Sequence, residues 1–284
     1  MNNNVFQDLK SKVFLSGNPL YLYIGINAIV FVLVALIGLF TFLMQSSFSI
    51  NEFISEYLAL PASFALLPQR FYTIITYIFF HADFFHLLFN MLALFWFGNV
   101  FMNFLSSRQF HFVFLAGGLA GAFFFVAALN IFPAFSASVN SSNVIGASAA
   151  VMAIIVATAT LVPNYAFFLL FFGEVKIKYI AIVYFVLDII GATSTNAGGS
   201  LAHIGGALLG FIYIKRLQSG SDWSKIFERK PKLRVVRNEK PVQKPAGNGV
   251  SQQEIDSILD KISSSGYDKL TAAEKEKLFK ASKD

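Results

Sequence analysis

The feature that most constrains this chain is a stretch of 202 residues, from Val13 to Ile214, that holds only nine charged side chains. The other 29 of the 38 charged residues lie in the two ends. A soluble domain has about 25% charged residues, whereas this chain has 13% charged and 56% apolar residues. So few charges could not cover the surface of a soluble fold. The composition therefore excludes a soluble globular enzyme, a disordered chain and, despite a net charge of +6, a nucleic-acid-binding protein, and it predicts a polytopic membrane protein.

Hydropathy divides the charge-poor stretch into six apolar segments that we expect to be membrane-spanning helices, so the predicted fold class is an all-α polytopic membrane protein. A spanning helix needs about 20 apolar residues. The first segment has 24 uncharged residues, more than the roughly 7–15 of a signal-peptide core, and is expected to be a retained span. The fourth and fifth segments are short for a full crossing. The six segments are residues 20–43, 84–105, 110–130, 148–163, 177–191 and 200–217.

The basic residues predict the orientation. With six spans both termini lie on one side, which receives seven basic residues before the tail is counted, whereas the other side receives only Arg70. Basic residues concentrate in cytosolic loops, so we expect both termini in the cytosol. On the external side, residues 44–80 are apolar enough to lie in the membrane interface, and residues 131–147 form a loop rich in Ser and Asn.

The composition also predicts how the chain is divided. Two capping boxes, Ser251-x-x-Glu254 and Thr271-x-x-Glu274, each open an amphipathic segment, and Gly266 ends the first of the two helices. The basic, Pro-containing segment before them either contacts anionic lipid or is a solvated linker, and the second reading is favoured. The predicted regions are a cytosolic N-terminal tail (1–19), a membrane domain (20–217), a basic linker (218–250) and a small cytosolic helical hairpin (251–284).

Histidine and serine are the residues that can perform chemistry here, because the chain has no cysteine and hence no thiol nucleophile, disulfide or thiolate metal site. His81 and His86 are five positions apart, and a helix turns about 100° per residue, so they are poorly spaced as a pair of metal ligands. No glutamate lies in the neighbouring spans, so the sequence predicts no metal site and no cofactor. His111, at a predicted cytosolic helix end, is expected to be an interfacial residue without a catalytic role.

Two short motifs place polar groups where predicted helices begin. His86 and Asn90 are four residues apart and share one helix face. Gly146-Ala147-Ser148 lies where the Ser/Asn-rich loop meets the fourth span, so the serine hydroxyl is presented beside free backbone N–H groups that can hold a developing oxyanion. A Gly-Ala-Ser-Ala run is also an ordinary packing surface of small residues. The motif alone leaves both readings open.

A third motif lies in the sixth span. Gly206 and Gly210 form a Gly-x-x-x-Gly face, which lets another helix approach closely, and His203 is one turn earlier on nearly the same face. Where the approaching helix is the fourth span, Ser148 and His203 become a serine nucleophile and its general base. Gly205 is rotated about 100° from Gly206 and is expected to lie away from this contact.

In this order and across six spans, His-x₄-His-x₃-Asn, Gly-x-Ser and Ala-His-x₂-Gly-x₃-Gly resemble the rhomboid family of intramembrane serine proteases, in its bacterial form with an appended C-terminal tail. The resemblance covers about residues 15–217. It implies a six-helix rhomboid-like bundle in the bacterial inner membrane. It also implies that the protein hydrolyses peptide bonds in or near transmembrane segments of membrane-protein substrates, with the lipid bilayer as its surroundings and without a cofactor or a nucleic-acid partner.

The resemblance further implies a role for each matching residue. Ser148 would be the nucleophile, and His203 the general base and later the acid. His86 and Asn90 would donate hydrogen bonds to the oxyanion, together with the backbone N–H of Ser148. The residues expected to support this arrangement are His81, which holds the external loop structure in the family, Gly146, Gly206 and Gly210.

The sequence departs from the family pattern at two places. Many members have glycine directly after the serine, where this chain has Ala149. Many members also carry Trp-Arg in the first loop, three residues before a threonine, whereas here Thr76 follows Tyr72-Thr73 and that anchor is missing.

Three readings remain to be weighed. The first is an active protease, the second a rhomboid-like pseudoprotease that binds membrane clients without cutting them, and the third an unrelated transporter. The sequence favours the first, because Ser148 and His203 are both present and no intramembrane charge pair or symmetric broken helix of the transporter kind is visible. Asp188, the acidic residue inside a predicted span, is read either as a third member of the site or as a polar packing residue, and the packing role is favoured.

Overall fold

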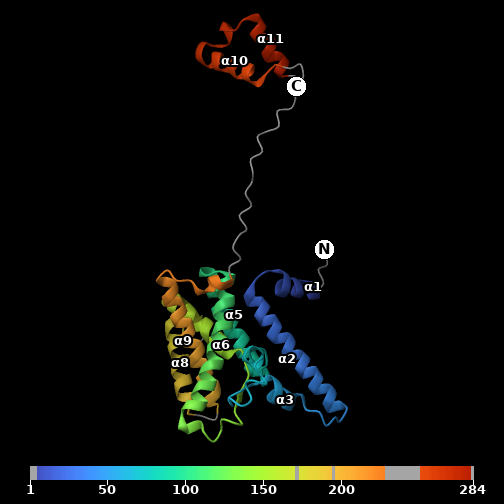
Figure 1. Cartoon of the computed structure of the whole chain (residues 1–284), viewed down its shortest axis with the longest axis vertical. Helices are drawn as coiled ribbons and strands as arrows, with labels where there is room; N and C mark the ends of the chain where they lie inside the picture. Colours follow the sequence, from blue (N-terminus) through green and yellow to red (C-terminus); the bar gives the residue numbers. More distant parts are fainter. Residues whose placement is uncertain (1–4, 170–172, 194–195, 228–249, 283–284) are drawn as a thin grey trace. The chain divides into compact units, whose positions relative to one another are not determined.

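The computed structural model describes residues 5–169, 173–193, 196–227 and 250–282. The chain forms two compact units, Met1–Arg229 and Lys230–Asp284. The first unit is a bundle of helices and the second is a small pair of helices (Figure 1).

Helices form at all six predicted positions. Four of them are long and apolar enough to cross a membrane, judged by length and composition over the described residues. The other two have 14 and 15 residues. The predicted class, an all-α polytopic membrane bundle, is therefore confirmed, while the count of six crossings stays a prediction. The helices are α2 (Pro19–Leu43), α5 (Phe84–Phe104), α6 (Ser107–Ile131), α7 (Ser148–Leu161), α8 (Ile177–Gly191) and α9 (Ala197–Gln218).

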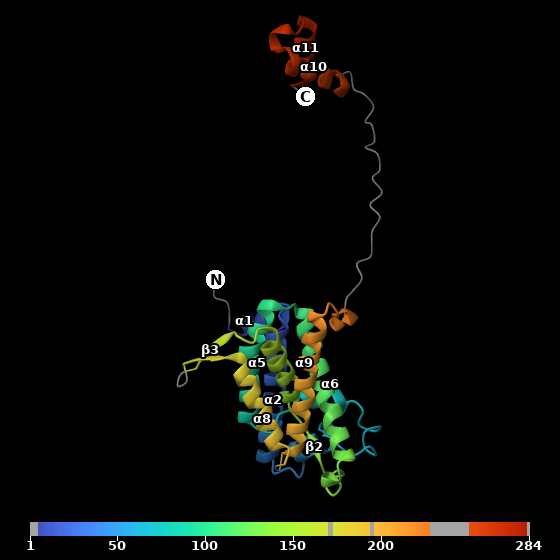
Figure 2. The ribbon, with the colours of Figure 1, turned by 90° about the vertical axis from the view of Figure 1, so that its left-hand side faces the viewer.

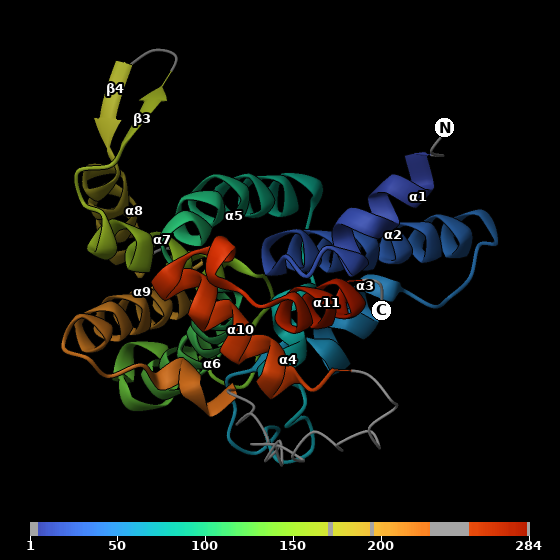
Figure 3. The same cartoon turned by 90° about the horizontal axis from the view of Figure 1, so that it is seen from above.

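The core of the bundle is built around α7, which lies against α5, α6 and α9 (Figure 3). Ten of its 14 residues are buried, from Ala149 to Ala159. By contrast α2 packs only through its N-terminal part and diverges from the bundle along the rest of its length (Figure 1). Tyr23 of that part stacks on Phe114 with ring centroids 4.0 Å apart, and its hydroxyl lies 3.0 Å from Nδ1 of His111. His111 thus joins α2 to α6.

Glycines bring α9 into backbone contact with two neighbours. A Cβ added to Gly206 would collide with the carbonyl oxygen of Ala149, and one added to Gly210 with the carbonyl oxygen of Ala153, so this face meets α7 as the spacing predicted. Gly205 lies away from the contact with α7, as expected, but it is not on an open face of the helix. Its added Cβ would lie 2.6 Å from the carbonyl oxygen of Ala120, because α6 packs on the opposite side of α9.

The long segment before α5 is tied to the loop that precedes α7. Strand β1 (Leu60–Pro61) pairs antiparallel with β2 (Asn143–Val144). Between α2 and β1 lie α3 (Ile50–Phe53) and a π-helical turn (Ile54–Leu58), and after β1 come α4 (Thr73–Thr76) and a 3₁₀ turn (Tyr77–Phe79). These short elements expose aromatic side chains, and their placement in the membrane interface stays a prediction.

Other contacts take the place of the missing Trp-Arg anchor. The Arg70 guanidinium lies over the ring of Tyr57, 5.5 Å from its centroid, and the Tyr72 hydroxyl donates to the Tyr57 carbonyl at 2.8 Å. The Asn143 amide donates to both the carbonyl and the hydroxyl oxygen of Ser55, at 3.0 and 2.7 Å. The first loop is therefore fixed to itself and to the strand that leads to α7.

A β-hairpin that the sequence analysis did not predict connects α7 to α8. Its strands are β3 (Ala166–Leu169) and β4 (Gly173–Lys176), and it projects from the bundle (Figure 2). Phe167 packs its ring against Phe97 of α5, while Phe168 points away and is exposed.

Helical turns extend the membrane domain at both of its predicted ends. The predicted N-terminal tail contains α1 (Val5–Lys10) and a π-helical turn (Ser11–Leu15). Within the predicted linker, a 3₁₀ turn (Trp223–Phe227) follows α9 and packs on α6. Asp222 accepts from the Arg108 guanidinium at 3.0 Å and from the Tyr213 hydroxyl at 3.0 Å. Residues 228–249 of the predicted linker lie outside the described residues.

In the second unit both predicted capping boxes form. Ser251 caps α10 (Gln252–Ser265) and Thr271 caps α11 (Ala272–Ala281), each with its glutamate in the third helical position. A 3₁₀ turn (Tyr267–Lys269) joins the helices after Gly266, whose φ of +85° suits glycine. Lys261 reaches Glu274 and Lys277 reaches Glu254, both at 2.8 Å, so ion pairs join the two helices.

Candidate active site

An open cavity of about 710 Å³ lies at the end of the bundle where α5, α7 and α9 begin and α8 ends. The side chains predicted to act as nucleophile, base and oxyanion donors all line it, which brings together residues that are far apart in the sequence. The polar residues lining the cavity are Asp83, His86, Asn90, Asn143, Ser148, Tyr184, Asp188, Asn196 and His203.

Ser148 is the first residue of α7, so the backbone N–H groups of this first turn have no partner within the helix. Gly146 sets the approach of the chain to this point with a φ of +132°, a conformation that side chains disfavour. A Cβ at Gly146 would lie 2.9 Å from Nε2 of His86 and 3.5 Å from the Ser148 hydroxyl oxygen. The Gly-x-Ser spacing therefore serves two needs, a backbone turn and room for the two side chains that converge on it.

His203 lies in the second turn of α9, and its ring is fixed from one side. Nδ1 lies 2.7 Å from Oδ1 of Asp188, near the end of α8. A carboxylate can only accept, so Nδ1 carries the hydrogen and Nε2 is the nitrogen left to act as a base. The two side chains are 22% and 14% exposed, respectively.

Ser148 and His203 face the same cavity, but among the described residues no hydrogen bond joins the Ser148 hydroxyl to His203. Catalytic hydrogen bonds are often long in structures without a substrate and shorten when the substrate binds. The Ser148 hydroxyl and the His203 imidazole therefore line the same cavity, and a hydrogen bond between them would have to form when the substrate binds.

The opposite wall belongs to α5. Asp83 caps this helix by accepting from the backbone N–H of His86 at 2.9 Å, which fixes where the helix begins. One N–H of the buried Asn90 amide donates to the His86 carbonyl at 2.8 Å, and a second N–H remains on the same nitrogen. The side chains of His86 and Asn90 thus both line the cavity.

His81 is buried behind this site. Burial lowers the pKa of His81 to about 3, so its ring is neutral. Nε2 accepts from the backbone N–H of Ala147 at 3.5 Å, and the ring meets His86 edge-on with centroids 5.0 Å apart. The backbone N–H of Gly146 donates to the Tyr77 carbonyl at 2.9 Å. His81 and Tyr77 therefore hold the residues just before Ser148.

Sequence reasoning underrated one residue of the cavity. Asp188 was expected to pack, yet it contacts the imidazole of His203. The signal in the sequence was an acidic residue inside an apolar helix, which is costly and typical of a functional position. Among the described residues no group of three or more His, Cys, Asp or Glu side chains is arranged to hold a metal ion.

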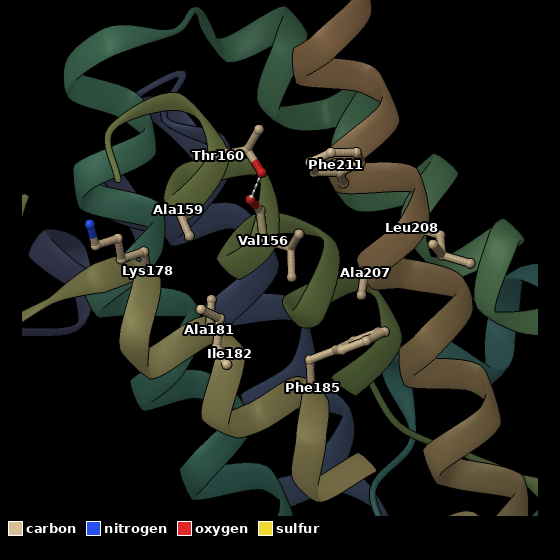
Figure 4. Close-up of a pocket in the computed structure, with 10 residues that line it drawn as sticks. All are labelled: Val156, Ala159, Thr160, Lys178, Ala181, Ile182, Phe185, Ala207, Leu208 and Phe211. Atoms are coloured by element: carbon tan, nitrogen blue, oxygen red, sulfur yellow. Dashed lines mark hydrogen bonds between the residues drawn. The ribbon is translucent and has the colours of Figure 1, made fainter. Parts of the chain in front are cut away.

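A second cavity, of about 310 Å³, lies along the same helix α8 but toward the other end of the bundle (Figure 4). Apolar side chains of α7, α8 and α9 line most of it, among them Val156, Ile182, Phe185 and Phe211. The side chains that face it include Thr160, whose hydroxyl donates to the carbonyl of Val156. Lys178 also lines it, and none of the residues that line the first cavity lines this one, so it is separate from the candidate site.

Comparison with known proteins relates both parts of the chain to known families. The Rhomboid domain family matches residues 68–219, which is more than half of the chain. A family of unknown function (DUF6576) matches residues 249–284. The curated protein "RHOMBOID-like protein 12, mitochondrial" of Arabidopsis thaliana is 31% identical over 161 residues, which cover 53% of this chain and 48% of that protein. The chain thus spans about half the length of this relative.

Proposed function

Because this chain belongs to the rhomboid family, we propose that it is an intramembrane serine endopeptidase that uses Ser148 as nucleophile and His203 as general base. The observation that carries the proposal is the convergence of four side chains on one cavity. Ser148 and His203 come from the α7–α9 wall, and His86 and Asn90 come from α5.

In the first step the Ser148 hydroxyl oxygen bonds to the carbonyl carbon of the scissile peptide, while its proton passes to Nε2 of His203. The carbonyl oxygen becomes an oxyanion. The imidazolium then gives its proton to the leaving amine, the C–N bond breaks, and an acyl ester remains on Ser148. Water, activated by the same imidazole, hydrolyses the ester and restores the hydroxyl.

The oxyanion is held by donors that are already in place before the reaction. These are the backbone N–H of Ser148, the His86 imidazole and the free N–H of the Asn90 amide. Preorganised donors of this kind contribute about 10²- to 10³-fold each to the rate of acyl-transfer enzymes. Water for the second step enters through the open cavity, whose lining includes nine polar side chains.

We propose transmembrane proteins as the substrates, cut in or near their membrane segments. The exposed apolar face of α8 is the side from which such a segment approaches, because it leads directly to the cavity. We propose a bacterial inner membrane as the protein's location, from the resemblance to bacterial members of the family, and cytosolic termini, from the distribution of basic residues. A reporter fused after Asp284 and another inserted near Arg108 should both respond as cytosolic.

The test is labelling of the purified protein with a fluorescent fluorophosphonate, which reacts only with an activated serine. Wild type should label, and both Ser148→Ala and His203→Ala should abolish labelling while the protein stays at normal membrane levels. Labelling that persists in Ser148→Ala would assign the reactivity to another residue. No labelling of wild type, with a client protein still retained, would instead identify a rhomboid-like pseudoprotease.

A further inference from the structure

Asp188 is an acidic side chain that the proposed serine–histidine mechanism does not use. It lies three residues before the end of α8, in a helix whose other residues from Ile177 to Gly191 are apolar except for Lys178 and two tyrosines. Its oxygen Oδ1 lies 2.7 Å from Nδ1 of His203, while Oδ2 is buried without a hydrogen-bond partner among the described residues.

A purely structural role explains this arrangement poorly. A buried polar atom without a partner is costly, and such atoms are few in folded proteins. The carboxylate does have one property that a neutral residue lacks, since it stabilises a positive charge on the imidazole it contacts.

The contact also selects the reactive form of His203. In a neutral imidazole one nitrogen carries hydrogen and the other accepts, and the choice is set by the hydrogen bond that the first one makes. With Nδ1–H held by Asp188, Nε2 is the nitrogen that keeps a free lone pair, and His203 lines the same cavity as Ser148. In soluble serine proteases a third residue performs this task, and its loss lowers kcat about 10⁴-fold.

We propose that Asp188 is a positioning residue that completes a Ser148–His203–Asp188 triad in this protein. It holds His203 in the tautomer with hydrogen on Nδ1 and stabilises the imidazolium that forms when Nε2 takes the serine proton. No proton is transferred to Asp188 itself. This inference rests on the proposed protease function, because it assigns a role to the base of that reaction.

The place of the contact within the bundle supports this role. Only two residues of α8, Ile177 and Ala181, are buried, and both lie in its first five residues. Around Asp188, Leu187 and Ile189 are more than half exposed. The Asp188 carboxylate is thus directed into the bundle from a helix end that is otherwise weakly packed, and it meets the base of the site.

The test compares four variants by the rate at which a fluorescent fluorophosphonate labels Ser148. Two quantities are measured for each variant, the maximal labelling rate and the probe concentration that gives half of it. Asp188→Asn should lower the maximal rate about 10²-fold or more while leaving the half-maximal concentration within about twofold, because orientation of the base is lost and probe binding is not. Asp188→Glu should label faster than Asp188→Asn, because it keeps the charge. Ile189→Ala, on the exposed face next to it, should label like wild type, and Ser148→Ala should not label.

These variants separate charge from packing. Asparagine has the shape of aspartate and glutamate does not, so a packing role predicts the reverse order, with Asp188→Asn above Asp188→Glu. That order would overturn the triad while the proposed protease function stands. So would Asp188 variants whose maximal labelling rate is normal and which differ from wild type only in the probe concentration at half-maximal rate or in the amount of protein. Wild type that does not label through Ser148 would overturn both.

A second measurement needs no variant at position 188. In the ¹H spectrum of the wild-type protein with ¹⁵N-labelled histidine, an Nδ1–H donated to a carboxylate gives a proton resonance far downfield of ordinary amides. We expect this signal in wild type and in Ser148→Ala, and its loss in His203→Ala. Its absence from wild type would overturn the proposed contact.

Discussion

Helices α7 and α8 both contact α9, and they do so in opposite ways. Between α7 and α9 the backbones touch, because Gly206 and Gly210 present no side chain to the carbonyls of Ala149 and Ala153. Between α8 and its neighbours lie two cavities, of about 710 and 310 Å³, and the hydrogen bond from His203 to Asp188. One contact is dry and rigid, and the other is loose and partly polar.

The difference shows how the site divides its tasks. Ser148 and His203, the proposed nucleophile and base, come from the two helices that cannot move apart without breaking backbone packing. The proposed oxyanion donors, His86 and Asn90, come from α5, which also packs against α7. The residue proposed to position the base comes from α8, the helix with the least buried surface of the four. Relative placement of Ser148 and His203 therefore depends on small residues, and access to them depends on α8.

The largest expected effect follows from breaking the rigid contact. In Gly206→Val the new side chain must displace the Ala149 carbonyl, which shifts Ser148 relative to His203. A misplacement of about 1 Å can cost about 10²-fold in rate, so we expect fluorophosphonate labelling to fall at least that far. The protein should still insert, because valine is no less apolar than glycine.

The control for this variant has to be chosen from the structure. Gly205→Val was the natural choice from sequence, but it meets the Ala120 carbonyl of α6 and is also expected to disturb packing. Ile212→Val lies on the same helix at a position that is 44% exposed, and it should label like wild type. Normal labelling in Gly206→Val would show that the backbone contact does not set the geometry of the site.

A somewhat smaller effect is expected on the α5 wall. His86→Ala and Asn90→Ala each remove one oxyanion donor and leave the contact between α7 and α9 intact, so each should lower kcat about 10²-fold with a smaller change in KM. The measurement is steady-state cleavage of a transmembrane reporter that wild type cuts. A change in KM alone, with kcat preserved, would assign these residues to substrate binding.

We expect an enlarged side chain to be tolerated on α8, which borders the cavities, but not on α7, whose backbone is in close contact with its neighbours. Ala181→Leu adds three carbon atoms next to the cavity of about 310 Å³, where there is room for them. We expect activity within about twofold of wild type, the range of substitutions that cause no strain. Ala153→Leu, a change of the same size that faces Gly117 of α6 across a close contact, should instead abolish activity. Equal losses in the two variants would remove the distinction between the two contacts.

The smallest effect on proteolysis is expected from the C-terminal unit. The hydrogen bonds from Lys261 and from the backbone of Thr271 lower the pKa of Glu274 from 4.5 to about 2. A carboxyl group whose pKa is lowered in the folded protein stabilises the folded form at every pH above its ordinary pKa of 4.5. This stabilisation is lost as the pH falls from about 4.5 toward 2. Hydrogen exchange in residues 252–281 of the full chain should therefore accelerate over this range, and less so in Glu274→Gln, with labelling of Ser148 in that variant unchanged at neutral pH.

Periodicity and composition predicted the positions of the six helices within a few residues, because apolar length is a direct requirement of the bilayer. Local signals predicted the caps at Ser251 and Thr271 and the turn at Gly266 equally well. Ser148 and His203 were found from short motifs, and the structure brings both to one cavity.

What could not be predicted depends on contacts between distant segments. The β3–β4 hairpin was not predicted, because the sequence analysis assigned no element between the fourth and fifth spans and the pairing of its strands shows only in the structure. The close contact of Gly205 with α6 was not predicted, because the pattern of one helix does not reveal that α6 packs behind it. The contact of Asp188 with His203 joins residues 15 positions apart on two helices. No residue spacing within either helix predicts it.

The length of α7, which has 14 residues, limits how far this helix can reach across the membrane. A helix of this length is about 21 Å long, and the hydrocarbon layer is about 30 Å thick, so the helix by itself falls about 9 Å short of crossing it. Non-helical backbone is tolerated at membrane depth only where protein covers it or water reaches it. Ser148 is the first residue of α7, and it lines the open cavity at that end of the helix. If Ser148 is the nucleophile as proposed, the length of α7 sets the depth in the membrane at which it lies, and one added turn at the start of the helix would move it by about 5 Å toward the aqueous phase.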